Sequence, residues 1–157
     1  MSDSTRSRWW LIAWALLPFL AALGGAAFPP DAWFVALVKP SWQPPSWLFG
    51  PVWSALYLMM GIAAGLVWLR GPCLREKAAL AAFLIQLGLN ALWTPVFFGL
   101  HAPGIALAII MLMWVSILIT MLRFARVSGV AAWLLAPYLA WVSFATALNG
   151  EIWRLNP

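Results

Sequence analysis

The side chains best placed to do chemistry are aromatic rings that recur at helical spacing inside apolar stretches. Phe49, Trp53 and Tyr57 stand at i, i+4 and i+8, which puts three rings on one face of a helix. A second such face, nearer the C-terminus, carries Tyr138, Trp141, Ala145 and Leu148. Such rings either stack on a flat apolar molecule or pack neighbouring helices, and Trp and Tyr also gather where a membrane meets water. The stripes alone leave these alternatives open.

Two amides lie among the rings of a third apolar stretch. Gln86 and Asn90 share a helix face with Trp93 and Phe97. Unpaired polar groups are costly in hydrocarbon, so we expect both amides to face the interior of a helix bundle. A cavity with Trp and Phe walls and one or two amides suits a flat, apolar ligand. The amides therefore favour a ligand cavity over simple packing.

Groups for nucleophilic, acid–base or metal chemistry are scarce. The acidic residues, Asp3, Asp31, Glu76 and Glu151, lie outside the apolar stretches or at their ends, and Cys73 is the only cysteine. The lone histidine, His101, lies in a tight turn. It is either an ordinary loop residue or an axial ligand to a haem. The sequence offers no nucleophile–base pair, phosphate loop, metal cluster or intramembrane carboxylate typical of proton-coupled transporters. We expect a binding protein that requires no cofactor or metal, rather than an enzyme.

The elements that position these residues are five apolar blocks. They cover about residues 9–28, 48–69, 78–100, 104–124 and 130–153, close to the roughly 20 residues that a helix needs to cross a bilayer. The chain is 65% hydrophobic and 8% charged, whereas a soluble domain is about a quarter charged. Backbone groups in lipid must be satisfied within the segment, which favours helices. The sequence predicts one all-α membrane domain, residues 1–157, of five transmembrane helices.

Basic residues indicate the orientation. With the N-terminus inside, the inner side carries seven Lys and Arg residues and the outer side two: Arg6, Arg8, Arg70, Arg75, Lys77, Arg123 and Arg126 against Lys39 and Arg154. This bias predicts that the N-terminus lies on the inner side. The net charge of +5 then serves orientation and contact with anionic lipid head groups rather than nucleic acid. A signal peptide is an alternative reading of the first block, but its apolar run is longer than usual.

The first loop, residues 28–47, is too apolar to extend into water. Ala32 to Val38 suits a short interfacial helix, and Pro40, Pro44 and Pro45 then impose extended backbone. We expect this loop to fold over the bundle as a lid.

In the next block Gly61 and Gly65 have GxxxG spacing, which permits close helix contact either within the chain or in a dimer.

Three segments carry a resemblance to a known family. They are KPSWQPPSWLFGPVWSALY (39–57), LNALWTPVFFG (89–99) and PYLAWVSFATALN (137–149). In this order they resemble the TspO family, which comprises the tryptophan-rich sensory proteins of bacteria and the mitochondrial translocator protein. The resemblance implies a five-helix bundle, often a homodimer, with a ligand pocket under the first loop. It also implies ligands such as protoporphyrin or haem, and for some members cholesterol or isoquinoline and benzodiazepine-type drugs.

By position, the resemblance places these residues in the pocket: Trp42, Phe49, Gly50, Trp53, Asn90, Trp93, Phe97, Leu112, Trp141, Ala145 and Leu148; the aromatic stripe adds Tyr57. The sequence departs from the family pattern at two places. Gly150 and Glu151 break the cholesterol-recognition pattern of the family, so cholesterol is not an expected ligand. Trp33-Phe34 replaces a Trp-Tyr pair that the resemblance associates with light-dependent porphyrin breakdown.

Three functional hypotheses follow. The first is a sensor or regulator of tetrapyrrole metabolism or traffic that binds porphyrins in the membrane. The second is a transporter of porphyrins or lipids, although the sequence shows no inverted repeat. The third is a light-dependent porphyrin-degrading enzyme, for which Trp33 and Trp141 are the candidate catalytic residues. Helical spans favour the inner membrane of a bacterium, and the resemblance leaves the outer membrane possible.

Overall fold

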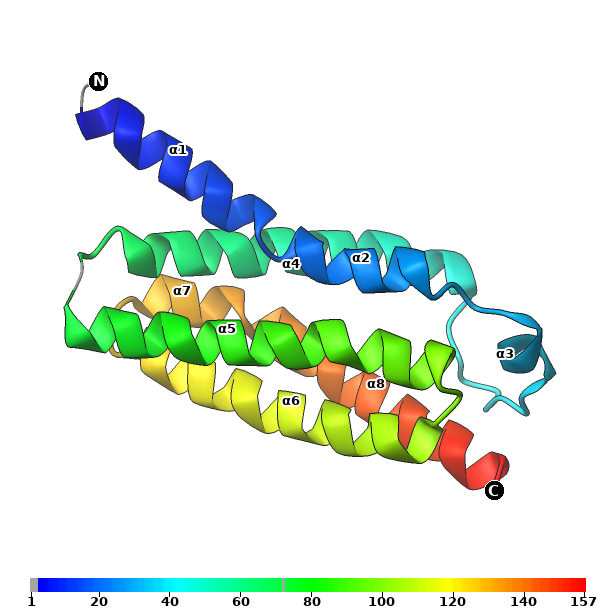
Figure 1. Ribbon diagram of the computed structural model, residues 1–157. Helices are drawn as coiled ribbons and strands as arrows, with labels where there is room; N and C mark the ends of the chain where they lie inside the picture. The colour runs from blue at the N-terminus through cyan, green and yellow to red at the C-terminus, as the bar shows by residue number, and fades with distance from the viewer. Residues whose placement is uncertain (1–2, 72) are drawn as a thin grey trace.

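The computed structural model describes residues 3–71 and 73–157, and helices dominate this part of the chain (Figure 1). In chain order the helices are α1 (Asp3–Leu16), α2 (Phe19–Ala27), α3 (Ala32–Ala36), α4 (Ser46–Trp68), α5 (Leu74–Thr94), the π-helical turn η1 (Pro95–Gly99), α6 (Pro103–Ala125), α7 (Gly129–Leu134) and α8 (Ala136–Leu155).

Four long apolar segments form the membrane bundle. Ser46–Trp68, Leu74–Gly99, Pro103–Ala125 and Gly129–Leu155 are each long and apolar enough to cross a bilayer, and Trp9–Leu23 is a shorter apolar stretch. In Figure 1 α4, α5, α6 and α8 run alongside one another, with α3 and the C-terminus at one end of the bundle. The prediction of a five-segment, all-α membrane bundle with a structured first loop is confirmed.

The first segment differs from the prediction of one helix over residues 9–28, because it is broken at Pro18. Proline lacks an N–H, and its ring clashes with the carbonyl four residues earlier, here that of Trp14. The helical bond from Leu17 to Ala13 (3.0 Å) is accordingly followed by a tighter turn, Leu20 N–H to Leu17 C=O (3.1 Å). As a result α1 takes a different direction from α2: α1 contacts α4 while its N-terminal end points away from the bundle, and α2 lies along α5 (Figure 1).

The GxxxG pair on α4 is used within the chain. A Cβ added to Gly61 would lie 2.5 Å from the Trp14 oxygen and 2.5 Å from the Ala15 Cα. At Gly65 the nearest atom would be the Leu11 side chain at 2.9 Å. Because α1 passes this close, the two glycines pack α1 on α4, which is the close backbone approach that GxxxG permits.

The half of the bundle towards the α4–α5 and α6–α7 turns contains a tightly packed core. Met60, Phe83, Phe124 and Tyr138 are completely buried there, and the rings of Phe83 and Phe124 stack with centroids 6.1 Å apart. Close packing of this kind leaves little internal space. The cavity therefore lies in the other half of the bundle, under the first loop.

The end of α5 departs from regular α-helix at Pro95. Since Pro95 cannot donate a backbone hydrogen bond, the chain widens into η1, with Leu100 N–H bonded to Pro95 C=O at 2.9 Å. The segment ends at His101, whose φ of 51° is the left-handed conformation that reverses the chain into α6. The π-helical turn changes the rotation of the residues that follow it, among them Phe97 and Phe98.

The lid, residues 28–47, contains the expected short helix as α3. Asp31 caps its first turn by accepting a hydrogen bond from Phe34 N–H (3.1 Å). Lys39 Nζ donates to the carbonyls of Val35 (3.1 Å) and Leu37 (3.3 Å) at its other end. Asn156, near the C-terminus, donates to Val38 C=O (2.9 Å) and accepts from Val38 N–H (3.0 Å). The lid is thereby tied to the last helix as well as to itself.

Candidate ligand-binding site

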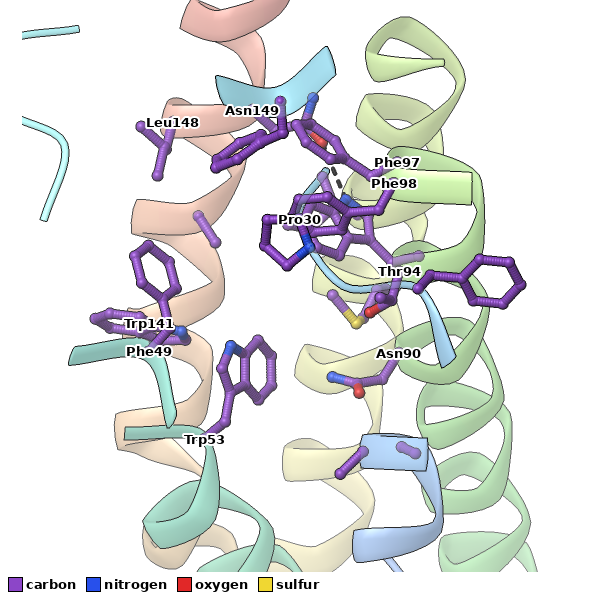
Figure 2. A pocket seen from close by; sticks show the side chains of 18 of the residues that line it. Pro30, Phe49, Trp53, Asn90, Thr94, Phe97, Phe98, Trp141, Leu148 and Asn149 are labelled. Carbon is purple, nitrogen blue, oxygen red and sulfur yellow. Dashed lines mark hydrogen bonds between the residues drawn. The ribbon is translucent and has the colours of Figure 1, made fainter. Parts of the chain in front are cut away.

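A cavity of about 310 Å³ lies between α2, α4, α5, α6 and α8, beneath the lid (Figure 2). Its lining residues are Ala21, Ala22, Phe28, Pro30, Phe34, Gln43, Ser46, Phe49, Trp53, Tyr57, Asn90, Trp93, Thr94, Phe97, Phe98, Ile110, Met113, Trp141, Ala145, Leu148, Asn149 and Ile152. None of these side chains is charged. The volume lies at the lower end of the range for small-molecule sites, and the composition is typical of them.

Aromatic side chains from different helices face one another across the cavity. In Figure 2 Phe49, Trp53 and Trp141 lie on one side, and Asn90 and Phe97 on the other. Phe49 packs edge-to-face on Trp141 (centroids 5.7 Å apart, planes at 71°). On α5, Trp93 and Phe97 stack with centroids 4.9 Å apart and planes at 23°. Two aromatic walls with open space between them suit a planar apolar molecule.

A chain of hydrogen bonds closes the inner end of the cavity. Tyr57 Oη donates to Asn90 Oδ1 (3.0 Å), and Asn90 Nδ2 donates to Tyr138 Oη (3.1 Å). Tyr138 Oη donates in turn to Gln86 Oε1 (2.8 Å). Gln86 and Asn90 are buried, as their predicted inward orientation requires. Both amides are thus paired with tyrosines of α4 and α8, and this holds the rings next to the cavity in fixed positions.

A second polar chain joins α5, α8 and the start of α6. Trp93 Nε1 donates to Asn149 Oδ1 (3.0 Å), and Asn149 Nδ2 donates to Pro103 C=O (2.8 Å). The Trp93 indole is consequently fixed both by this bond and by its stacking on Phe97. Asn149 was not among the predicted ligand-binding residues, although its position inside an apolar block was a signal that could have found it.

Two polar atoms of the cavity walls have no protein partner. Trp141 Nε1, a donor, and Gln43 Oε1, an acceptor, are buried without a hydrogen bond to any residue that the structure describes. Both residues line the cavity. Buried polar groups are normally paired, so each of these two atoms has capacity for one hydrogen bond to a molecule in the cavity.

Beside the cavity, His101 ties the lid to the turn between η1 and α6. Its Nε2 lies 2.9 Å from Asp31 Oδ2, and its ring stacks on Trp33 with centroids 4.3 Å apart. The Phe34 N–H, and less strongly His101, hold the pKa of the Asp31 carboxyl below its ordinary value. His101 does not line this cavity but a separate pocket with Trp33 and Trp153, so its position does not favour an axial ligand to a haem held between the two aromatic walls.

Nine of the twelve residues predicted to bind ligand line the cavity: Phe49, Tyr57, Trp53, Asn90, Trp93, Phe97, Trp141, Ala145 and Leu148. The other three do not. Trp42 packs edge-to-face on Phe144, and Gly50 is exposed on α4. Leu112 is 60% exposed on α6, while Met113 next to it lines the cavity. Of the two candidate catalytic residues, Trp141 lines the cavity, whereas Trp33 packs between His101 and Phe97 just outside it.

Several lining residues were not predicted from the sequence. Ile110 and Met113 of α6, together with Ala21 and Ala22 of α2, have no polar or aromatic signal that separates them from lipid-facing neighbours. The lid residues Pro30, Phe34, Gln43 and Ser46 were not predicted individually, because a loop has no helical periodicity to show which side faces inward. Their arrival at the cavity agrees with the expected lid.

These features define a class of protein: a five-segment α-helical membrane protein with an uncharged, aromatic-walled cavity beneath a structured loop. The comparisons specify the family. A model of the TspO/MBR family matches residues 12–154, so the chain belongs to this family. It is similar to the tryptophan-rich protein TspO of Chlorobaculum tepidum, with 49% identity over 137 residues (85% of this chain, 87% of the relative).

Relatives of other names are similar over most of the chain. The tryptophan-rich sensory protein of Cereibacter sphaeroides is 45% identical over 150 residues, which cover 91% of this chain and 92% of the relative. The translocator protein of Homo sapiens is 41% identical over 150 residues, which cover 92% and 89%. The TspO/MBR membership expected from the three sequence segments is thus confirmed, as is an integral membrane protein.

Proposed function

We propose that this protein binds porphyrin-type tetrapyrroles, such as protoporphyrin or haem, in its intramembrane cavity and acts as a sensor or regulator of tetrapyrrole metabolism or traffic. The uncharged cavity between two aromatic walls is the observation that carries the proposal. A tetrapyrrole is a flat, extended π-system, and stacking between Trp and Phe rings is its natural mode of recognition. Drug-like planar molecules would bind by the same contacts.

The shape of the bundle supports binding and sensing over transport. The cavity is closed on its inner side by the Tyr57–Asn90–Tyr138–Gln86 chain and by the packed core around Met60 and Phe83. A transported molecule would have to displace both. Flux of protoporphyrin into sealed proteoliposomes that exceeds flux through protein-free liposomes would favour the transporter instead.

The binding proposal is tested by titrating the purified protein with protoporphyrin and following the porphyrin absorbance band. We expect saturable binding that weakens at least about tenfold when Trp53→Ala and Trp141→Ala are combined, because two large stacking surfaces are lost. Trp133→Ala is the matched control, since Trp133 is 78% exposed on α7 and away from the cavity. Equal affinity in the double variant and the control would refute the proposed site.

Light-dependent breakdown of porphyrin is the alternative activity. Trp141 lines the cavity, and Trp33 lies against Phe97 at its edge, so an excited ligand would be close to two oxidisable indoles. Chromatography of illuminated complexes would show a defined product that depends on Trp33 and Trp141. Bleaching at the rate of free porphyrin in detergent would exclude the enzyme.

We further propose a homodimer in the inner membrane of a bacterium, with the N-terminus on the inner side and lipid around the remaining surface. Large apolar side chains cover the outward faces of α5 and α6, among them Ile85, Met111, Leu112 and Leu122. Cross-linking in native membranes would reveal the dimer. A monomer after cross-linking at several exposed positions would argue against it.

A further inference from the structure

The underside of the lid carries a carboxamide that the fold leaves partly unused. Gln43 lines the cavity, and its Oε1 is buried without a hydrogen-bond donor among the residues that the structure describes. An unpaired buried carbonyl oxygen is costly, and native proteins rarely keep one. The position of this oxygen at the cavity wall therefore points to a partner within the cavity.

The lid backbone holds Gln43 in place. Its N–H donates to Pro40 C=O at 3.0 Å, closing a turn, and Pro44 and Pro45 restrict the chain immediately after it. Ser46 follows at the start of α4 and also lines the cavity. The constrained backbone on both sides therefore fixes the place in the lid from which the Gln43 side chain reaches the cavity.

The chemistry of the cavity narrows the choice of partner. A carboxamide presents an acceptor and a donor side by side, which matches a neutral carboxyl group that donates through O–H and accepts at C=O. An uncharged, apolar site favours the neutral form of a carboxylic acid, because burial penalises the charge. Lys39, the basic residue of the lid, has its ammonium engaged with the carbonyls of Val35 and Leu37.

Resting on the proposed function, we infer that Gln43 reads a carboxyl group on the rim of the bound ligand, so that the site prefers planar acids to their esters. The aromatic walls bind the ring system, and the Gln43 carboxamide pairs with the acid at the lid. The cavity is small for a tetrapyrrole, so part of such a ligand must lie at the edge of the cavity, and Gln43 offers a polar group on the side that the lid covers.

The experiment compares protoporphyrin IX with its dimethyl ester, which has the same ring but no acidic O–H. Both are titrated into the full-length wild type and the Gln43→Met variant, which keeps the side-chain length but loses the carboxamide. The wild type should prefer the acid by about five- to tenfold, the contribution expected from the one hydrogen bond that the ester cannot donate to Gln43 Oε1, and the preference should disappear in the variant. Comparing the two ligands on each protein cancels their different partition into detergent.

Three further variants make the result decisive. Gln43→Leu also removes the carboxamide, so it should likewise lose the preference for the acid, and it covers the case in which Gln43→Met does not fold. Ser54→Ala, on the exposed face of α4, should retain the wild-type preference. Lys39→Met should retain it as well. If Lys39→Met loses the preference while Gln43→Met keeps it, an ammonium reads an ionised carboxylate and our inference is overturned.

The outcome also separates this inference from the proposed function. If the wild type and Gln43→Met bind acid and ester equally and saturably, porphyrin binding stands and the role of Gln43 is refuted. If the wild type binds neither porphyrin saturably, both the proposed function and the inference fall.

Discussion

At the inner end of the cavity the Tyr138 hydroxyl makes two hydrogen bonds, accepting from Asn90 and donating to Gln86. The Tyr57 hydroxyl makes one, to Asn90. Hydrocarbon offers no replacement partner for an amide group that loses its bond. Replacing Tyr138 by phenylalanine therefore leaves two amide groups without a partner, whereas replacing Tyr57 leaves one, although each change removes a single oxygen atom.

We expect Tyr138→Phe to lower the free energy of unfolding by about 1–3 kcal/mol, because two buried amide groups lose their partner. Tyr57→Phe should cost less, about 0.5–1 kcal/mol. Equilibrium unfolding in mixed micelles, followed by far-UV circular dichroism, measures both. Equal losses in the two variants would contradict the importance that we assign to the Tyr138 hydroxyl.

At this scale spacing predicted the aromatic residues of the cavity walls better than its other lining residues. Phe49, Trp53 and Tyr57 were recognisable because large aromatic residues at i, i+4 and i+8 must share a face. Leu112 and Met113 were not distinguishable, since both are apolar and neighbouring positions differ only by rotation about the helix axis. Resemblance placed Leu112 in the cavity, and the structure places Met113 there instead.

Among the helices, the contact of α1 with α4 depends on the absence of a side chain at Gly61. A Cβ at this position would meet backbone atoms of Trp14 and Ala15 at 2.5 Å, and backbone cannot yield as a side chain can. At Gly65 the obstacle is the flexible end of Leu11 at 2.9 Å. The two glycines therefore have different tolerances.

We predict that Gly61→Ala destabilises the protein by about 1–3 kcal/mol through overpacking, and that Gly65→Ala costs less. Gly88→Ala, on α5, is the control. A Cβ there meets nothing within 4 Å, and alanine favours the helix by up to about 1 kcal/mol. Thermal melting in detergent orders the three variants. A melting temperature of Gly61→Ala at or above that of Gly88→Ala would show that α1 does not pack as described.

The stability of the lid helix α3 should depend on pH through Asp31. The pKa of this carboxyl is below its ordinary value of 3.8, chiefly because the ionised form accepts the Phe34 N–H. A lowered pKa in the folded protein means that the stabilisation is fully present above 3.8 and is lost as the pH falls through the lowered value. We expect the melting temperature difference between wild type and Asp31→Ala to be constant near neutral pH and to shrink in acid. A difference that persists at the lowest pH would mean that the ionised carboxylate is not what stabilises α3.

The elements show where prediction from sequence reached its limit. Length and hydropathy located five membrane segments, because a bilayer requires long uninterrupted apolar runs. They did not reveal the break at Pro18 or the π-helical turn at Pro95, since a proline in a membrane helix can instead be accommodated by a kink. Which of these occurs depends on neighbouring helices, and these are not local in the sequence.

For the whole molecule, the basic residues support one orientation. Arg75 and Arg123 donate to the carbonyls of Arg126 (3.3 Å) and Ala78 (3.2 Å), at the end of the bundle opposite the lid. This end carries most of the Lys and Arg residues and should face the inner side. Cys73, the only cysteine of the chain, is exposed at the same end.

We predict that a membrane-impermeant maleimide labels Cys73 in inverted membrane vesicles and leaves it unlabelled in intact spheroplasts. Ser41→Cys in a Cys73→Ser background, with an exposed position on the lid, should show the opposite pattern. Labelling is read by a mass shift on a gel. Modification of Cys73 from the outside would reverse the assigned orientation.

The hydrogen-bonded group of Tyr57, Gln86, Asn90 and Tyr138 determines more than the shape of a pocket. A helix gains about as much from contact with lipid tails as from contact with apolar side chains. Apolar contacts alone therefore hardly determine the rotation of a helix about its own axis. A rotation of α5 by one residue would turn both amides about 100° away from their tyrosines and leave them without hydrogen-bond partners in an apolar environment. These four side chains thus fix the rotation of α4, α5 and α8 about their own axes, which apolar contacts with lipid would leave undetermined.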